Sequence, residues 1–162
     1  MCEQRIKDVV ASTPAMKLLM TLPGVGPILG VVIAMEIGDV ERFAGADRLA
    51  SYAGTVPRVS SSGGKTYYGK VRPDVNRYLK WAFVEAANVV TVHQRHWPNR
   101  HVVRLYRRIR ERKGHAKAAV AVARHLAEAS YWVLKKNEPY REPKYNIPTS
   151  STREETRRPH EN

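Results

Sequence analysis

The chain has 162 residues, enough for one domain with a hydrophobic core and a tail. Its 28 Lys and Arg against 15 Asp and Glu leave a formal charge of +13, an excess that favours a polyanionic partner. The single cysteine, Cys2, excludes an internal disulfide, and no apolar run reaches the ~20 residues that span a bilayer. We therefore expect a cytoplasmic, nucleoid-associated protein that binds nucleic acid and no membrane.

The spacing of apolar residues and the placement of proline and glycine predict an all-α chain. Residues 1–13 form a remnant helix or linker, and residues 14–137 form the folded domain. Its helices are predicted at about residues 14–21, 27–37, 47–52, 74–90, 100–113 and 115–136. The second of these is apolar on nearly every face, so we expect it to be buried. Residues 138–162 combine many charges with four prolines, which predicts a disordered basic tail.

One long segment before the helix at residues 74–90 lacks helical spacing. Residues 55–72 carry Pro57, three adjacent serines and the pair Gly63-Gly64. This composition predicts one long, exposed Ser/Gly-rich loop, with room for a small hairpin around the two glycines. Loops of such length in a compact domain are usually functional or disordered.

The sequence Leu22-Pro-Gly-Val-Gly, followed by a helix, fits the helix-hairpin-helix pattern. Gly24 and Gly26 let the chain turn tightly, and the next helix points its first N–H groups and positive dipole end at a phosphate. Such contacts are independent of base sequence. The alternative is an ordinary turn between two helices, which Pro27 favours because it removes one N–H group.

The helix at residues 100–113 is strongly basic. Helical spacing gathers four arginines on one face: Arg100, Arg104, Arg107 and Arg108. The opposite face is apolar and is expected to dock on the core: Val102, Leu105, Tyr106 and Ile109. Because a solvated face usually mixes charges of both signs, we interpret this one as a surface for a nucleic-acid backbone. The pattern does not distinguish DNA from RNA.

Two further groups of side chains are assigned to structure rather than to binding. His93, His96 and His101 are close in the sequence, but nothing nearby completes a four-ligand zinc site. The three tryptophans are able to stack on bases, but their spacing beside aliphatic residues places most of them in the core. Tyr67 and Tyr68, in the serine-rich loop, are the aromatic residues that we expect to face nucleic acid.

The serine-rich loop carries candidate phosphate ligands. Four basic residues flank its serines and are placed to stabilise charge developing on a phosphate: Arg58, Lys65, Lys70 and Arg72. Taken alone, Ser60-Ser61-Ser62 indicates a flexible turn, because serine needs activation before it attacks a phosphate.

Several segments in combination resemble one family. They are Leu22-Pro-Gly-Val-Gly, Leu49-Ala-Ser-Tyr-Ala-Gly, Val56-Pro-Arg, Ser62-Gly-Gly-Lys and Arg72-Pro-Asp-Val-Asn-Arg-Tyr-Leu-Lys-Trp. In this order they resemble the C-terminal domain of the IS110/IS116 group of insertion-sequence transposases, whose members look like RNA-guided serine recombinases. The resemblance covers about residues 14–137. It implies DNA binding and strand transfer in transposition, and it admits a guide RNA as a further partner.

The resemblance also implies a mechanism, in which a serine of this loop attacks a DNA phosphodiester and holds one strand end covalently. On the family's Pro-x-x-Ser-Gly pattern the candidate nucleophile is Ser62, with Ser61 as the fallback because three adjacent serines leave the register open. The residues facing the phosphate are then Arg72, Arg77 and Lys80. For the last two, the alternative is a solvated flank of a buried helix.

One feature of the family has no counterpart in this sequence. Family members carry an N-terminal RNase-H-like domain with four acidic residues that bind magnesium, whereas residues 2–12 contain only Glu3 and Asp8. We therefore expect no cofactor in this chain, magnesium only with the acidic domain, and a truncated, internally started or split transposase that is not autonomous. Strand exchange needs more than one active site, so we expect a homo-oligomer or a separate acidic partner domain.

Two alternatives remain open at this level. A non-catalytic nucleic-acid-binding module would keep the helix-hairpin-helix and the basic helix but perform no chemistry. An RNA-binding accessory protein would bind RNA clearly better than duplex DNA at equal salt. The serine loop separates the first alternative from a transposase, and the preferred nucleic acid separates the second.

Overall fold

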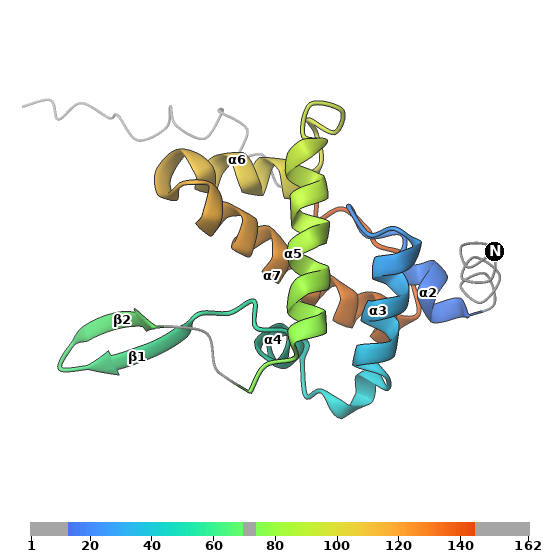
Figure 1. The fold of residues 1–162 in the computed structure, drawn as a ribbon, viewed down its shortest axis with the longest axis horizontal. Helices are drawn as coiled ribbons and strands as arrows, with labels where there is room; N and C mark the ends of the chain where they lie inside the picture. Colours follow the sequence, from blue (N-terminus) through green and yellow to red (C-terminus); the bar gives the residue numbers. More distant parts are fainter. Residues whose placement is uncertain (1–12, 70–73, 145–162) are drawn as a thin grey trace, which may run out of the picture.

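The computed structural model describes residues 13–69 and 74–144, which form a helical body with one projecting hairpin (Figure 1). The α-helices of these ranges are α2 (Pro14–Leu19), α3 (Pro27–Ile37), α4 (Ala46–Tyr52), α5 (Arg77–Val92), α6 (His101–Lys113) and α7 (His115–Lys136), with a 3-10 turn, η1 (Val40–Arg42), before α4. The helical class is therefore confirmed for the body. None of the helices in these ranges is both long enough and apolar enough to span a membrane. The predicted remnant helix, residues 1–12, lies outside them.

Two residues explain where the long helices begin. α5 begins at Arg77 rather than at Asp74 because Asn76 is its N-cap, and the Asn76 side-chain oxygen accepts a hydrogen bond from the Leu79 N–H at 3.0 Å. Gly114, with a φ of 82°, separates α6 from α7. Asn76 as an N-cap and Gly114 as a helix break therefore take the roles that asparagine and glycine usually have at helix ends.

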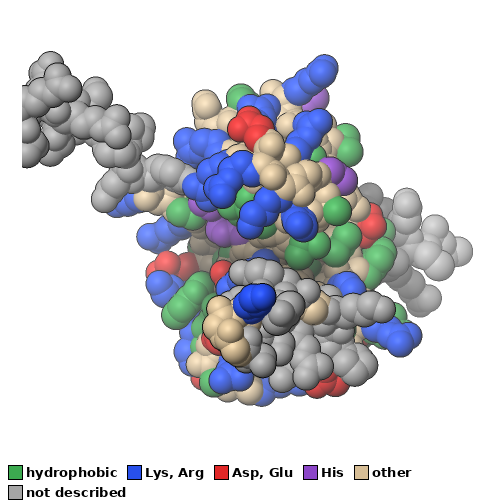
Figure 2. Space-filling model, turned by 90° about the vertical axis from the view of Figure 1, so that its left-hand side faces the viewer, with side chains coloured by type: hydrophobic (Ala, Val, Ile, Leu, Met, Phe, Trp, Pro, Cys, Tyr) green, Lys and Arg blue, Asp and Glu red, His purple; other side chains and the backbone are tan. Residues whose placement is uncertain are grey.

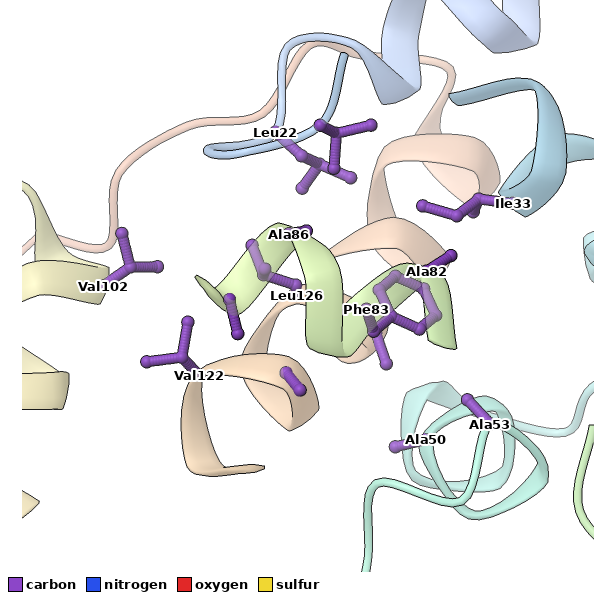
Figure 3. Packing of buried hydrophobic residues seen from close by; sticks show 14 of the residues in the cluster. Leu22, Ile33, Ala50, Ala53, Ala82, Phe83, Ala86, Val102, Val122 and Leu126 are labelled. Atoms are coloured by element: carbon purple, nitrogen blue, oxygen red, sulfur yellow. The ribbon is translucent and has the colours of Figure 1, made fainter. Parts of the chain in front are cut away.

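The helices α5 and α7 form the centre of the body. α7 packs against α2, α4, α5, α6 and η1, and α5 also packs against α3 and α6. Several buried residues of α7 are small and permit close helix packing: Ala118, Ala123 and Ala127. Figure 3 shows Phe83 of α5 and Leu126 of α7 in this core, with Leu22 and Ile33 from the N-terminal segments. Burying one such large side chain contributes about 1.5–3 kcal/mol, so the core fixes how these segments sit on α5.

The helix α3 is less buried than its composition predicts. Ile33 and Ile37 are fully buried, but Ile28 is 64% exposed and Met35 is 72% exposed. Among the described elements α3 makes its main contacts with α2 and α5, and Arg42 of η1 donates hydrogen bonds to the carbonyl groups of Glu36 and Ile37 at its end. The expectation that this helix is buried all round is therefore wrong, because apolar composition does not reveal how many neighbours a helix has.

The segment predicted as a loop contains a two-stranded antiparallel hairpin. β1 (Arg58–Ser62) pairs with β2 (Lys65–Gly69), which carries Tyr67 and Tyr68. Gly63 and Gly64 connect the strands with φ values of 59° and 73°, the positive values that a two-residue type I′ turn requires. The prediction of one long Ser/Gly-rich loop is therefore corrected: most of the described part of the segment forms a hairpin around the two glycines. Figure 1 shows this ribbon projecting from the base of the body, beside α4.

The chain after α7 runs back along the body. The Tyr140 N–H donates to Thr21 Oγ1 at 2.8 Å, and the Tyr140 hydroxyl lies 3.1 Å from His125 Nε2. Burial lowers the pKa of His125 and of His101, whose rings are 4.7 Å apart, and raises the pKa of Tyr140. The first residues of the predicted disordered tail, 138–144, thus have defined contacts, because this aromatic side chain packs against α7. Residues 145–162 lie outside the described ranges.

Candidate nucleic-acid interface

The turn between α2 and α3 passes very close to α5. Gly24 in this turn has a φ of 79°, a conformation that residues with a side chain rarely adopt. A Cβ atom at this position would lie 2.3 Å from the carbonyl oxygen of Ala86 on α5. The packing of the turn therefore requires glycine here, whether or not a phosphate binds nearby.

The second glycine of the turn has no such constraint. Gly26 is the N-cap of α3 in an extended conformation, and a Cβ there would meet no atom within 4 Å. The first N–H groups of a helix have no intrahelical partner, and here they belong to Ile28 and Leu29, two of the residues that line a groove of about 570 Å³. Trp97 and Arg100 line the same groove. The structure thus brings together two segments that the sequence assigns to phosphate binding separately.

The helix α6 has the two faces that its sequence predicts. Three of its predicted phosphate ligands are exposed: Arg104, Arg107 and Arg108. The side toward the core is buried at Val102, Val103 and Tyr106 and half-buried at Leu105 and Ile109. Figure 2 shows Lys and Arg side chains gathered over the upper part of this side of the molecule, where α6 lies. We call these three arginines the α6 arginine face.

Arg100 departs from the prediction. It is the N-cap of α6 rather than a member of its exposed face, and its guanidinium lies 5.7 Å from the centre of the Trp97 ring. One of its terminal nitrogens lies 3.7 Å from a carboxylate oxygen of Glu142, whose other oxygen accepts a hydrogen bond from the His101 N–H at 2.8 Å. The carboxylate therefore neutralises part of the charge that Arg100 brings to the groove.

The candidate serines lie near the tip of the hairpin. The last three residues of β1 are Ser60, Ser61 and Ser62. Ser62 pairs with Lys65 across the turn, whereas Arg58 pairs with Gly69 at the other end of the ribbon, roughly 13 Å along the strand. The structure therefore brings Lys65 opposite Ser62 and leaves Arg58 at the base. Two further predicted phosphate ligands lie outside the described ranges: Lys70 and Arg72.

Asn76 joins three elements at the start of α5. Its amide donates to the Glu36 carboxylate of α3 at 2.6 Å and to the Tyr52 hydroxyl of α4 at 3.3 Å. Its backbone N–H also donates to the Tyr52 carbonyl at 2.8 Å, and its side-chain hydrogen bond lowers the pKa of the Tyr52 hydroxyl. Arg77 and Lys80 follow on the first turn, and both are exposed. The sequence indicates a helix that begins close to Asn76, so a role as N-cap could be predicted. Nothing in the sequence predicts its hydrogen bonds to α3 and α4.

The aromatic residues are less buried than predicted. Trp81 on α5 is 48% exposed, Trp132 on α7 is 50% exposed and Tyr78 is 67% exposed. Of the three tryptophans, all within the described ranges, Trp97 alone is half-buried, and it stacks on His93 with ring centres 5.3 Å apart. The assignment of most tryptophans to the core is therefore wrong, because helical spacing alone does not say which face of a helix has a neighbour. In the part of the chain that the structure describes, no cluster of His, Cys, Asp and Glu is suited to hold a metal ion.

Comparison with known families identifies the chain. Residues 16–102, 87 of the 162, match the family described as "Transposase IS116/IS110/IS902 family". The chain belongs to this transposase family. The predicted resemblance is thereby confirmed, and the match to this transposase family runs from α2 through the groove, the hairpin and α5 to the first turn of α6.

Individual relatives align with more of the chain. It is 27% identical over 139 residues to the transposase for insertion sequence element IS1111A of Coxiella burnetii, covering 86% of this chain and 38% of that protein. It is 34% identical over 128 residues to the mini-circle putative transposase for IS117 of Streptomyces coelicolor, covering 75% and 27%. It is 29% identical over 145 residues to the pilin gene-inverting protein of Moraxella bovis, covering 85% and 44%. The chain therefore spans less than half the length of each of these relatives.

Proposed function

We propose that this chain is the DNA-binding and strand-transfer region of a transposase of this family. The observation that carries the DNA-binding part is the α6 arginine face, whose three arginines are exposed, with the Arg107 guanidinium donating to the side-chain and backbone oxygens of Gln94 at 3.4 and 3.2 Å. Such a face neutralises phosphates of a nucleic-acid backbone and releases their counterions. The relatives named as transposases, and the pilin gene-inverting protein, favour DNA as the nucleic acid.

In this proposal the turn between α2 and α3 acts as a helix-hairpin-helix that binds a second phosphate. Gly26 supports the proposal, since no contact with the residues that the structure describes requires a glycine there. The groove beside it adds Arg100, the charged group nearest the N-terminus of α3 among the lining residues. Because Gly24 is already required by packing on α5, and Pro27 donates no N–H, the evidence for phosphate binding rests on Gly26 and the groove.

We further propose Ser62 as the nucleophile of strand transfer, with Ser61 as the alternative. Its hydroxyl oxygen attacks the phosphorus of a DNA phosphodiester, the bond from phosphorus to one sugar oxygen breaks, and that oxygen takes up a proton. A hydroxyl of a second strand then attacks the same phosphorus and releases the serine, which regains a proton. Lys65, opposite Ser62 in the ribbon, is placed to stabilise negative charge on the phosphate. A guide RNA, further copies of the chain and an acidic domain with its magnesium are the other partners in this proposal.

One observation favours a non-catalytic DNA-binding module as the second candidate. The paired strands contain no His, Asp or Glu, the side chains that most commonly act as general bases, so neither β1 nor β2 supplies one of these to activate Ser62. Activation would then come from another part of the chain or from another domain. A covalent protein–DNA adduct that depends on Ser62 is the experiment that separates the two candidates.

The DNA-binding part predicts a change in salt dependence. We expect Arg104→Ala with Arg108→Ala to weaken duplex binding and to lower the slope of log K against log salt by about 2, because each arginine contacts one phosphate. Fluorescence anisotropy of a labelled duplex over a range of salt concentrations measures both quantities. The matched control is Arg124→Ala with Lys136→Ala, which removes two exposed charges from α7. Equal slopes for the two double variants would contradict a contact at the α6 arginine face.

The ion pair at the groove gives a second prediction. We expect Glu142→Gln to tighten duplex binding by up to about fivefold, because an exposed carboxylate no longer competes with phosphate for Arg100. Glu138→Gln is the control, since it removes the same charge from the same segment while its carboxylate pairs with Arg141 at 3.5 Å. The same titration measures both variants. An equal gain in both would show that only the net charge matters.

A further inference from the structure

The first two turns of α5 present two aromatic side chains between basic ones. Tyr78 and Trp81 are 67% and 48% exposed, and Arg77 and Lys80 are exposed beside them. Residues three apart on a helix are surface neighbours, with Cβ atoms about 5–6 Å apart. We call these four residues the α5 platform. The nearest acidic residues in the sequence are Asp74, before α5, and Glu85, four residues after Trp81, so the two basic side chains lie within the platform and an acidic residue borders it at each end.

The core and the helix cap hold the platform in this orientation. Leu79, Ala82 and Phe83 on the opposite side of the same turns are fully buried, which fixes the rotation of α5 about its axis. The hydrogen bonds of Asn76 to Glu36 and Tyr52 fix its first turn. The two rings are therefore held at the surface by the packing of their neighbours, and their exposure is a property of the fold.

The rings of the platform have no partner of their own in the described part of the protein. Trp132, the other strongly exposed tryptophan, has the Lys136 ammonium 5.2 Å from its ring centre and the Tyr131 ring at 5.1 Å. No ring or cation of the described residues stacks in this way on Tyr78 or Trp81. Two large adjacent rings without such a contact, framed by cations, have the composition of a surface that stacks nucleobases and neutralises their phosphates.

We propose that the α5 platform binds unpaired bases of a DNA strand, which stack on Tyr78 and Trp81 while Arg77 and Lys80 neutralise the adjoining phosphates. The inference rests on the proposed function, because exchange of DNA strands requires bases that have left their duplex. Every base has a π-face, so the platform binds them without preference for sequence. Its place favours this substrate: α5 is the next helix after the hairpin, and Asn76 at its start is hydrogen-bonded to α4, the helix before the hairpin. Strand ends handled at the serines would therefore have a docking surface on α5, the next helix along the chain.

The test compares single-stranded oligothymidine with a duplex of the same length, by fluorescence anisotropy on the full chain. We expect Trp81→Ala and Tyr78→Ala each to weaken single-strand binding about fivefold or more, while duplex binding changes less than about twofold. We expect Trp81→Phe to retain most of the affinity, because phenylalanine also stacks. An oligonucleotide with abasic sites in place of its bases should bind the Trp81→Ala variant and the unaltered chain equally. Circular dichroism verifies that each variant keeps its helical content.

The matched control is Trp132→Ala, which removes an equally exposed tryptophan from α7. A loss of single-strand affinity as large as that of Trp81→Ala would overturn the platform, and so would a Trp81→Ala loss that persists on the abasic strand. Light scattering on Trp81→Ala tests whether a second copy of the chain binds the platform instead. Loss of self-association with unchanged single-strand binding would assign the surface to that copy and overturn the inference. Absence of duplex binding by the unaltered chain would overturn the proposed function itself. Normal duplex binding with unchanged single-strand binding in Trp81→Ala overturns the platform alone.

Discussion

Ser62→Ala is expected to abolish formation of a covalent protein–DNA adduct without weakening DNA binding. Alanine removes the hydroxyl that forms the bond to phosphorus, whereas the α6 arginine face and the groove are untouched. The measurement is a denaturing gel of a nicked, end-labelled duplex incubated with the chain. An acidic N-terminal domain of the family, magnesium and guide RNA are supplied separately, because the chain spans less than half of its relatives.

Ser61→Ala is the matched control for this experiment. Successive positions of a strand belong to opposite faces of a ribbon, so positions 61 and 62 do not substitute for one another without a shift in register. We expect the adduct to persist in Ser61→Ala. The reverse pattern would move the nucleophile to Ser61 and keep the serine mechanism. An adduct that survives both substitutions would assign the attack on DNA to another residue. No adduct from the unaltered chain under any of these conditions would leave the non-catalytic DNA-binding module as the function.

Gly24→Ala is expected to lower the free energy of unfolding by about 3 kcal/mol. A residue with a side chain at a positive φ costs about 1–2 kcal/mol, and a methyl group forced against a backbone adds about 1–3 kcal/mol. The neighbour in this case is the Ala86 carbonyl at 2.3 Å, which moves only if α5 moves. For a domain of this size the change lowers the midpoint of thermal unfolding by roughly 6–12 °C. Urea denaturation followed by circular dichroism measures the free energy directly.

Gly26→Ala separates the structural role of this turn from its proposed binding role. Its φ of −92° suits alanine and its Cβ meets nothing, so the free energy of unfolding should fall by no more than about 1 kcal/mol, for a poorer helix cap. If the turn binds a phosphate, the same variant weakens duplex binding, because the methyl group lies where the phosphate approaches the backbone. A large loss of stability in Gly26→Ala would contradict the open geometry at this position. Unchanged DNA binding would remove the helix-hairpin-helix from the interface.

Local patterns predicted the helices well because their causes are local. The boundaries of α3 and α7 agree with those predicted, since proline, glycine and helical spacing act over a few residues. The α6 arginine face follows in the same way from a period of 3.6 residues. The hairpin was within reach of the sequence because the two adjacent glycines suit its turn, although the length of the strands was not apparent.

The features that the sequence did not reveal depend on pairs that are distant along the chain. Glu142 meets the N-terminus of α6 across 41 positions, and Asn76 meets Glu36 across 40. The exposure of Trp81 likewise depends on which helices pack against α5, and a helical period does not contain that information. The placement of Ser62 opposite Lys65 required the strand register.

The projecting hairpin and the helical body are expected to unfold as two separate units. An isolated two-stranded hairpin is only marginally stable in water, and neither strand makes an extensive contact with a helix among the described elements. Its amide protons should therefore exchange through local opening, while those of α5 and α7 exchange only when the whole body opens. The midpoint of thermal unfolding therefore reports the stability of the helical body. It does not report the stability of the hairpin that carries the serines. Contact of DNA with the ribbon would be visible instead as slower amide exchange along β1 and β2.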